Sequence, residues 1–127
     1  MKSRSINAAD APQPSGGYAQ AVEVAGISKL LFISGQVPLT ADGVLPSGFR
    51  QQCLLAWSNV EAQLRAAGMS LDNLVKVTTF LSARNYADEN RAVREEVLGA
   101  RSPVLTVIIT GIFDEEWLVE IEAVAAG

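Results

Sequence analysis

The strongest constraint on the fold is a helical stripe of apolar residues in the middle of the chain. Its members recur at steps of three and four residues: Phe49, Cys53, Trp57, Val60, Leu64 and Ala67. This spacing predicts an amphipathic helix, with Ser47 as its N-cap and Gly68 as its left-handed end. A helix with one apolar face must bury that face against another element, and the flanking segments have the patterns of strands.

Five further segments have the alternation or the β-branched content of strands: 18–25, 28–33, 74–81, 104–109 and 117–125. The first two are predicted to form a hairpin, after an irregular arm over 1–16. A second helix is predicted over 86–98, with Asn85 as its cap and Gly99 as its stop. The order β-β-α-β-α-β-β predicts one two-layer α+β domain over residues 1–127, in which two helices pack on a mixed sheet.

Charge and hydropathy limit the partners that we expect. The formal net charge is −4 and the ten basic residues are scattered, which argues against binding of nucleic acid. No segment approaches the roughly 20 apolar residues of a membrane span, and no apolar signal core follows Met1. We therefore expect a cytoplasmic protein without a membrane partner.

The chain contains no histidine and a single cysteine. The absence of histidine removes Ser-His and Cys-His nucleophile pairs and most zinc sites, so we expect no metal. Cys53 lies on the apolar stripe of the first helix, which favours an inert buried thiol over a nucleophile. Chemistry in this chain would depend on carboxylates, hydroxyls, amides, cationic side chains and bound water.

Polar residues interrupt two apolar patterns. Asn90 lies on the apolar stripe of the second helix, where an amide without partners would cost about 1–3 kcal/mol. Its spacing leaves two interpretations open, a structural amide or a ligand contact. In the last strand, Glu120 and Glu122 share one face, so they either line a cavity of low dielectric constant or lie on an exposed sheet face.

Taken together, these segments resemble the RidA/YjgF family, also labelled L-PSP endoribonucleases. The match extends over roughly residues 11–125. The matching stretches are Gly16-Gly-Tyr-Ala-Gln-Ala21, Leu31-Phe-Ile-Ser-Gly-Gln-Val-Pro38, Gln52, Asn59, Ala66-Ala-Gly68, Val75-Lys-Val-Thr-Thr-Phe-Leu81, Asn90 and Leu118-Val-Glu-Ile-Glu-Ala-Val-Ala125.

The resemblance implies a chorismate-mutase-like subunit. Three subunits would form a homotrimer around a central sheet barrel, with a small-molecule pocket at each interface. Active members hydrolyse enamines and imines such as 2-aminoacrylate to 2-keto acids and ammonia, without a cofactor. By resemblance, Glu120 rather than Glu122 would hold the attacking water. The residues that would contact the substrate are Tyr18, Ser34, Gly35 and Asn90.

In the family, an arginine in a Pro-Ala-Arg-Ser motif clamps the substrate carboxylate, and here two alignments of that motif compete. Leu105 lies 15 residues before Glu120, as the family's arginine lies before its glutamate, whereas Arg101 lies 19 residues before it. The spacing favours Leu105, which cannot pair with a carboxylate. A pocket lined by Leu105 and Val107 is then expected to prefer a less charged ligand, and efficient 2-aminoacrylate deamination is not expected.

Two other functions are kept as alternatives to a hydrolase. The first is a non-catalytic trimer that binds a metabolite as a sensor or acts like a chaperone. The second is an endoribonuclease, which the family's older label suggests and which the net charge of −4 and the absence of histidine disfavour.

Overall fold

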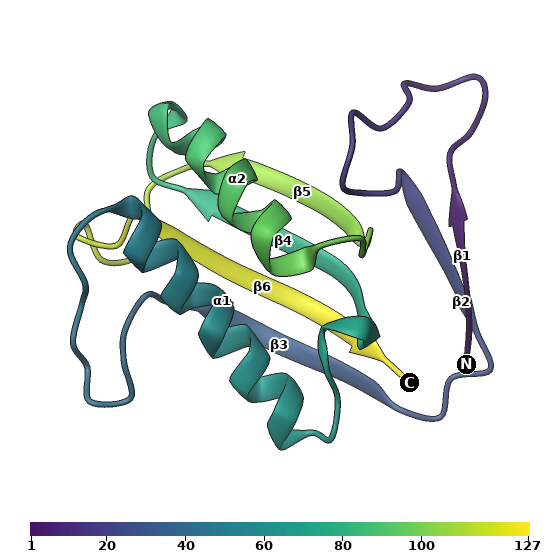
Figure 1. The fold of residues 1–127 in the computed structure, drawn as a ribbon, viewed down its shortest axis with the longest axis horizontal. Coiled ribbons are helices and arrows are strands. Elements are labelled where there is room, and N and C mark those ends of the chain that lie inside the picture. Colours follow the sequence, from purple (N-terminus) through teal and green to yellow (C-terminus); the bar gives the residue numbers. More distant parts are fainter.

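The computed structural model describes all 127 residues of the chain. Two helices cover one face of a four-stranded sheet, and two N-terminal strands form a separate hairpin (Figure 1). This arrangement confirms the predicted two-layer α+β fold. The elements in chain order are β1 (Lys2–Ile6), β2 (Ala21–Ala25), β3 (Leu30–Gln36), α1 (Phe49–Ala66), the 3₁₀ turn η1 (Leu71–Asn73), β4 (Leu74–Leu81), the 3₁₀ turn η2 (Arg84–Tyr86), α2 (Ala87–Leu98), β5 (Val104–Ile109) and β6 (Val119–Ala126).

The four-stranded sheet has the order β3-β6-β4-β5, so the C-terminal strand lies in its interior. Strands β4 and β5 are parallel and are connected through α2, whereas β6 runs antiparallel to both of its neighbours. The side chains of β6 alternate as predicted: Val119, Ile121 and Ala123 are buried, and the glutamates lie on the other face. Period-two alternation therefore fixes which face of the sheet the helices cover.

The N-terminal part differs from the sequence-based prediction in two ways. Residues 1–16 are not wholly irregular, because β1 lies within them and pairs antiparallel with β2. The predicted hairpin between 18–25 and 28–33 is wrong, since β3 pairs with β6 instead. The side chains of β1 are almost all exposed, so main-chain hydrogen bonds hold this pair together without an apolar pattern that sequence could reveal.

The predicted helix stops are confirmed and the predicted N-caps are wrong. Gly68 and Gly99 end the two helices with φ angles of 71° and 59°. The N-cap of α1 is Gly48 rather than Ser47, and no side chain caps that end. Asn85 belongs to the turn before α2, and Tyr86 occupies the N-cap position without a side-chain hydrogen bond. Tyr86 instead stacks on Phe49 of α1, with ring centroids 4.7 Å apart.

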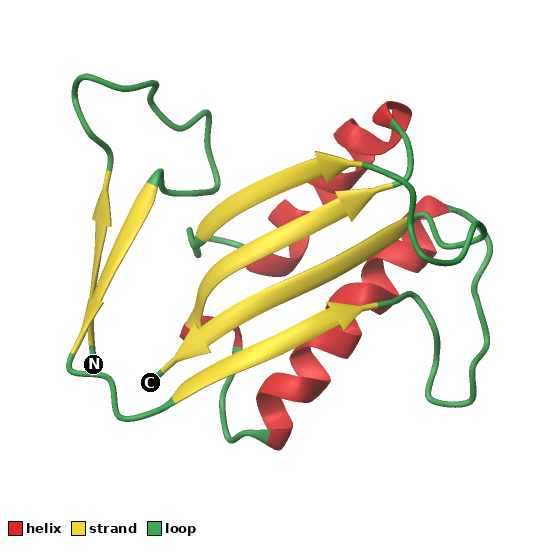
Figure 2. Ribbon diagram, turned by 180° about the vertical axis from the view of Figure 1, so that it is seen from behind, coloured by secondary structure: helices red, strands yellow, loops and turns green.

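The two faces of the sheet have different surroundings. Residues of β4 and β6 on one face pack against α1 and α2, and these include Val77, Leu81 and Ile121, which are fully buried. The opposite face has no element over it (Figure 2). Phe32 on that face exposes 73% of its surface. Neither helix has the length and apolar character needed to cross a membrane.

Candidate functional site

Glu120 is the second residue of β6 and lies on the uncovered face of the sheet, beside the end of β4. It pairs in register with Phe80 of β4, and its neighbours Val119 and Ile121 point to the helix side. A shallow hollow of about 290 Å³ adjoins Glu120, lined by Phe80, Thr110, Gly111, Ile112 and Phe113. The carboxylate therefore has apolar surroundings on one side and remains accessible on the other.

The Glu120 carboxylate lies directly against the backbone of Gly35. A Cβ atom added to Gly35 would overlap the carboxylate, 2.7 Å from Cδ and 3.0 Å from Cγ of Glu120. The contact arises where β3 is irregular between Ile33 and Gln36, so that its register against β6 shifts. Only glycine leaves room for this approach, which accounts for the Ser34-Gly35-Gln36 sequence at the strand end.

The surroundings of Glu120 favour its protonated form. Burial raises the pKa of its carboxyl group, and the negative charge of Glu122 on the same face raises it further. Glu122 is exposed and lines a second hollow with Ser34 and Lys76 farther along this face. Glu120, rather than Glu122, thus combines partial burial with a packed backbone neighbour.

A second group of predicted site residues lies at the edge of the sheet, around β5. Leu105 pairs with Val77 on the helix-facing side and is partly buried, and Val107 exposes 41% of its surface. Tyr18 lies beside the start of β5, because the N–H of Ala19 donates to the carbonyl of Pro103 over 3.4 Å. Within one chain, this group is separate from the Glu120 hollow.

Asn90 lies between the helices rather than beside Glu120. Its side chain is buried, and Cys53 Sγ on α1 donates to Asn90 Oδ1 over 3.8 Å. Burial raises the pKa of the Cys53 thiol to about 12, which agrees with an inert thiol. Within one chain, Asn90 therefore has the environment of a structural amide.

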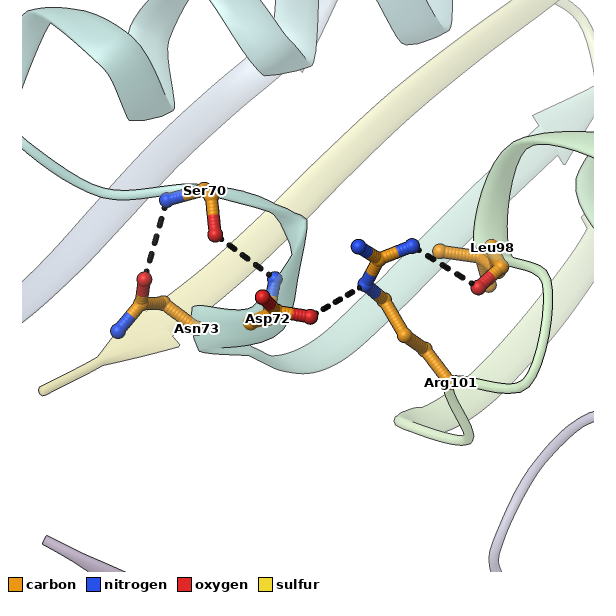
Figure 3. Close-up of polar contacts among 5 residues, drawn as sticks. All are labelled: Ser70, Asp72, Asn73, Leu98 and Arg101. Atoms are coloured by element: carbon orange, nitrogen blue, oxygen red, sulfur yellow. Dashed lines mark hydrogen bonds and ion pairs between the residues drawn. The ribbon is translucent and has the colours of Figure 1, made fainter.

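Arg101 is held at the opposite end of the sheet from Glu120. Its Nε donates to Asp72 Oδ1 over 2.7 Å, and its Nη1 donates to the carbonyl of Leu98 over 3.2 Å (Figure 3). Asp72 lies in η1, two residues before β4 begins, whereas the Phe80 partner of Glu120 lies near the end of β4. At about 3.3 Å per residue, this strand separates the two by about 20 Å. Arg101 therefore does not meet Glu120 within one chain.

Two amides of α1 fix the segments that carry the site. Asn59 Nδ2 donates to the carbonyls of Val37 and Leu39, just after the strand that carries Gly35. Gln52 accepts from the N–H of Leu118 over 2.8 Å, and its Nε2 donates to Glu116 O, just before the strand that carries Glu120. Both amides are among the residues that resemble the family in sequence, but the sequence alone assigned them no role.

The sequence analysis missed Arg94, which lies one turn after Asn90 on α2. Arg94 exposes only 8% of its surface, and its Nε has no hydrogen-bond partner. Helical spacing from Asn90 could have placed it on the inner face, but a charged side chain is ordinarily assigned to solvent. No group of three or more His, Cys, Asp or Glu side chains is arranged so that it could hold a metal ion.

Comparisons with known proteins agree in fold and family. The family model described as endoribonuclease L-PSP matches residues 8–127. A RutC family protein of Pyrococcus horikoshii is 31% identical over 118 residues, covering 91% of both chains. Among solved structures, a Yersinia pestis protein of unknown function from the conserved Rid family aligns over the full length of both chains, with a TM-score of 0.85 and 27% sequence identity. Escherichia coli TdcF with bound serine has a TM-score of 0.72 and 28% identity, covering 98% of both chains.

Proposed function

The chain belongs to the RidA/YjgF family, matched above as endoribonuclease L-PSP, and on that premise we propose that it hydrolyses a small enamine or imine in pockets between the subunits of a homotrimer. The observation that carries this proposal is the Glu120 carboxylate, which lies on the Gly35 backbone with its pKa raised by burial.

The separation of the predicted site residues supports the trimer. Glu120, Ser34 and Gly35 lie at the uncovered sheet face, and Tyr18 and Leu105 lie at the β5 edge. Neither group alone encloses a small molecule. A neighbouring subunit placed against the uncovered face would complete the pocket and would also bury exposed apolar side chains. These are Leu30, Phe32 and Ile108.

Glu120 can perform the proton transfers of imine hydrolysis without a cofactor. A water molecule bound to the carboxylate attacks the imine carbon, a carbon–oxygen bond forms, and Glu120 takes the released proton. The protonated carboxyl group gives this proton to the imine nitrogen, which yields a carbinolamine. Glu120 then takes the proton of the new hydroxyl group and passes it to the nitrogen as the carbon–nitrogen bond breaks, which releases a carbonyl compound and ammonia. A raised pKa suits both steps, because the group must hold the proton between them.

The ligand that we propose is not the 2-aminoacrylate of the family's active members. Leu105 occupies the clamp position in the alignment that spacing favours, and a leucine cannot pair with a carboxylate. Arg101 does not substitute for the clamp within the chain, since it is paired with Asp72. A small-metabolite site has support from TdcF, whose structure contains serine.

Ammonia release from a panel of imines, generated in situ by an amino-acid oxidase, tests this function. We expect at least one imine to be hydrolysed above background, and Glu120→Gln to lower its rate at least 100-fold, within the about 10²–10⁴-fold typical of acid–base groups. Glu115→Gln, in the exposed loop before β6, is the matched control and should keep the rate. Equal rates for the wild type and Glu120→Gln would refute the role of Glu120.

A non-catalytic metabolite-binding protein is the second candidate, and the bound serine of TdcF favours it. Mass spectrometry of ligands released from the purified chain separates the two candidates. A metabolite that is recovered bound and is not consumed on incubation supports binding alone, whereas its conversion supports the hydrolase.

A further inference from the structure

Arg94 has the most anomalous environment of any charged side chain in this protein. Only 8% of its surface is exposed, and it forms no ion pair and no hydrogen bond through its side chain. Its Nε is completely buried without a partner, whereas the two terminal nitrogens are not sealed off in this way. Buried polar groups are ordinarily paired, so an unpaired guanidinium calls for a partner outside the chain.

Three more exposed cations of the chain have partners. Arg50 pairs with Glu96 at 2.8 Å, Arg101 pairs with Asp72 at 2.7 Å, and Lys29 donates to the carbonyl of Ala67 at 2.7 Å. The chain has 14 acidic and 10 basic residues, so carboxylates are not scarce. The charge of the adjacent Glu95 acts on Arg94, but no carboxylate lies within ion-pair distance of it.

The surroundings of Arg94 add positive charge and lie beside the predicted pocket. Burial lowers the pKa of Arg94, and the charge of Arg91, three residues earlier on α2, lowers it further. Hydrogen bonds with Ser15 lower the pKa of the Tyr18 hydroxyl, and the charges of both arginines lower it by a smaller amount. Tyr18 borders the start of β5, and α2 lies over β4 and β5 (Figure 1).

We propose that Arg94 binds the anionic group of this protein's ligand, most simply a carboxylate, at the edge between α2 and β5. A planar guanidinium held by packing is preorganised for a bidentate carboxylate pair, and Arg91 strengthens the local positive potential. The Tyr18 hydroxyl, on which both arginine charges act, would contact the same ligand. An anion would neutralise the one cation that the fold leaves buried and unpaired.

This inference rests on the proposed function and makes its substrate class more specific. The proposed cation, Arg94, belongs to α2 rather than to β5. A carboxylate bound to it therefore lies at a different place from one bound to an arginine at position 105. The pocket would thus accept an organic anion but hold it differently from 2-aminoacrylate in a family member with the β5 arginine. The apolar Leu105 would then face the body of the ligand rather than its charge.

Calorimetric titration with 2-oxobutanoate, a short 2-keto acid, tests the proposal against its neutral analogue 2-oxobutanamide. We expect the wild type to bind 2-oxobutanoate more tightly than the amide. Arg94→Met, which retains the bulk and removes the charge, should weaken binding of the acid at least tenfold and leave the amide unchanged. Arg101→Met is the matched control, because that arginine already has a carboxylate partner in Asp72, and it should bind as the wild type does.

Thermal unfolding without ligand distinguishes a binding role from a structural one. Because a buried, unpaired charge opposes folding, Arg94→Met should have an unchanged or raised unfolding midpoint. A lowered midpoint with unchanged affinity for 2-oxobutanoate would make Arg94 a structural residue and overturn the proposal. Absence of 2-oxobutanoate binding in the wild type would overturn it as well.

A measurement on the wild type alone keeps the proposal testable if Arg94→Met does not fold. The buried Nε–H of Arg94 should give a separate ¹⁵N-correlated NMR signal that shifts on addition of 2-oxobutanoate and not of 2-oxobutanamide. An unmoved signal contradicts the proposal. Anion binding that depends on Arg94, without turnover of any imine, would support this inference and refute the hydrolase. Imine turnover that Arg94→Met leaves unchanged would support the hydrolase and refute this inference.

Discussion

At the residue scale, the candidate site depends on one carboxylate that packs against one glycine. Glu120 would be an ordinary exposed acid of an uncovered sheet face if position 35 carried a side chain. The missing Cβ lets the carboxylate lie on the Gly35 backbone, which removes water from one side of it. Partial burial and the charge of Glu122 then raise the pKa of Glu120. Gly35 and Glu122 together thus make Glu120 a group suited to proton transfer.

Gly35→Ala is therefore expected to impair both stability and activity. The new methyl group would overlap the Glu120 carboxylate and push this side chain out of its preferred rotamer, at a cost of about 1 kcal/mol of unfolding free energy. Chemical denaturation measures the loss. Gly111→Ala is the stability control, because a Cβ there has nothing within 4 Å, and its unfolding free energy should be nearly unchanged. Equal stability of the two variants would mean that the Glu120–Gly35 contact is absent in solution.

Glu120→Gln is expected to raise stability at neutral pH. The folded protein holds the Glu120 proton more tightly than the unfolded chain, whose pKa is near the reference value of 4.5. The stability contributed by this group is therefore present below that value and is lost as pH rises through the raised folded pKa. Unfolding curves at several pH values should show the advantage of glutamine at pH 7 and little advantage at pH 4. A glutamine variant that is less stable at pH 7 would contradict the raised pKa.

Sequence could predict part of this residue-scale arrangement. Alternation in 117–125 assigned Glu120 and Glu122 to one face, and the structure confirms that they share a face, which is the uncovered one. It could not distinguish a cavity from an exposed face, because the contact with Gly35 depends on a register shift in a distant strand. Arg94 was missed for a related reason, since helical spacing does not show that an arginine lacks a partner.

At the element scale, α1 acts as the support of the site. Its outward residues face solvent, but Gln52 and Asn59 use their amides to hold the chain after β3 and before β6. Loops held by only a few main-chain contacts would otherwise place Gly35 and Glu120 poorly. Each amide satisfies main-chain groups that the ends of the strands leave without partners.

Gln52→Glu tests this support with almost no change in volume. A carboxylate cannot donate to the carbonyls of Pro46 and Glu116, and Gln52 is buried, so we expect a loss of at least about 2 kcal/mol of unfolding free energy at pH 7. Repulsion by the carbonyls would raise the pKa of the new glutamate, so the loss should shrink at acid pH, where it can be protonated. Gln51→Glu, at an exposed position, should change little, and equal losses in both variants would refute the role of Gln52.

Elements with strong periodicity or β-branched content were predictable, and elements without them were not. The predicted strands 74–81 and 104–109 agree with β4 and β5 at both ends. Strand β1 was missed because its exposed side chains carry no apolar pattern. The helix N-caps were wrong because main-chain geometry at Gly48 and the stacking of Tyr86 on Phe49 decide where those helices begin.

At the scale of the whole molecule, the uncovered sheet face is the feature that a single chain leaves unexplained. Phe32 exposes 73% of its surface there, and the face carries both Glu120 and Glu122. A face of this kind on a small protein usually marks an interface. The proposed homotrimer gives that face a partner and gives Glu120 a second wall.

Phe32→Glu is accordingly expected to disrupt the assembly. Analytical ultracentrifugation of the wild type should give three times the 13.5 kDa of one chain, and the variant should shift towards the mass of one chain. A buried, unpaired carboxylate at each interface provides the physical reason. Val44→Glu, at an exposed loop position away from the sheet, should remain assembled. A monomeric wild type would remove the interface pocket from the proposal.

The proposed substrate preference depends on the residue that meets the ligand from β5. The most direct test is the rate of ammonia release from enzymatically generated 2-aminoacrylate, compared between the wild type and Leu105→Arg. With leucine at the clamp position, the wild type should stay close to the uncatalysed rate. Leu105→Arg should raise the rate at least tenfold, and Glu120→Gln should abolish that gain. Rapid, Glu120-dependent turnover by the wild type would show that this pocket already presents 2-aminoacrylate to Glu120 without an arginine on β5 and would contradict the account.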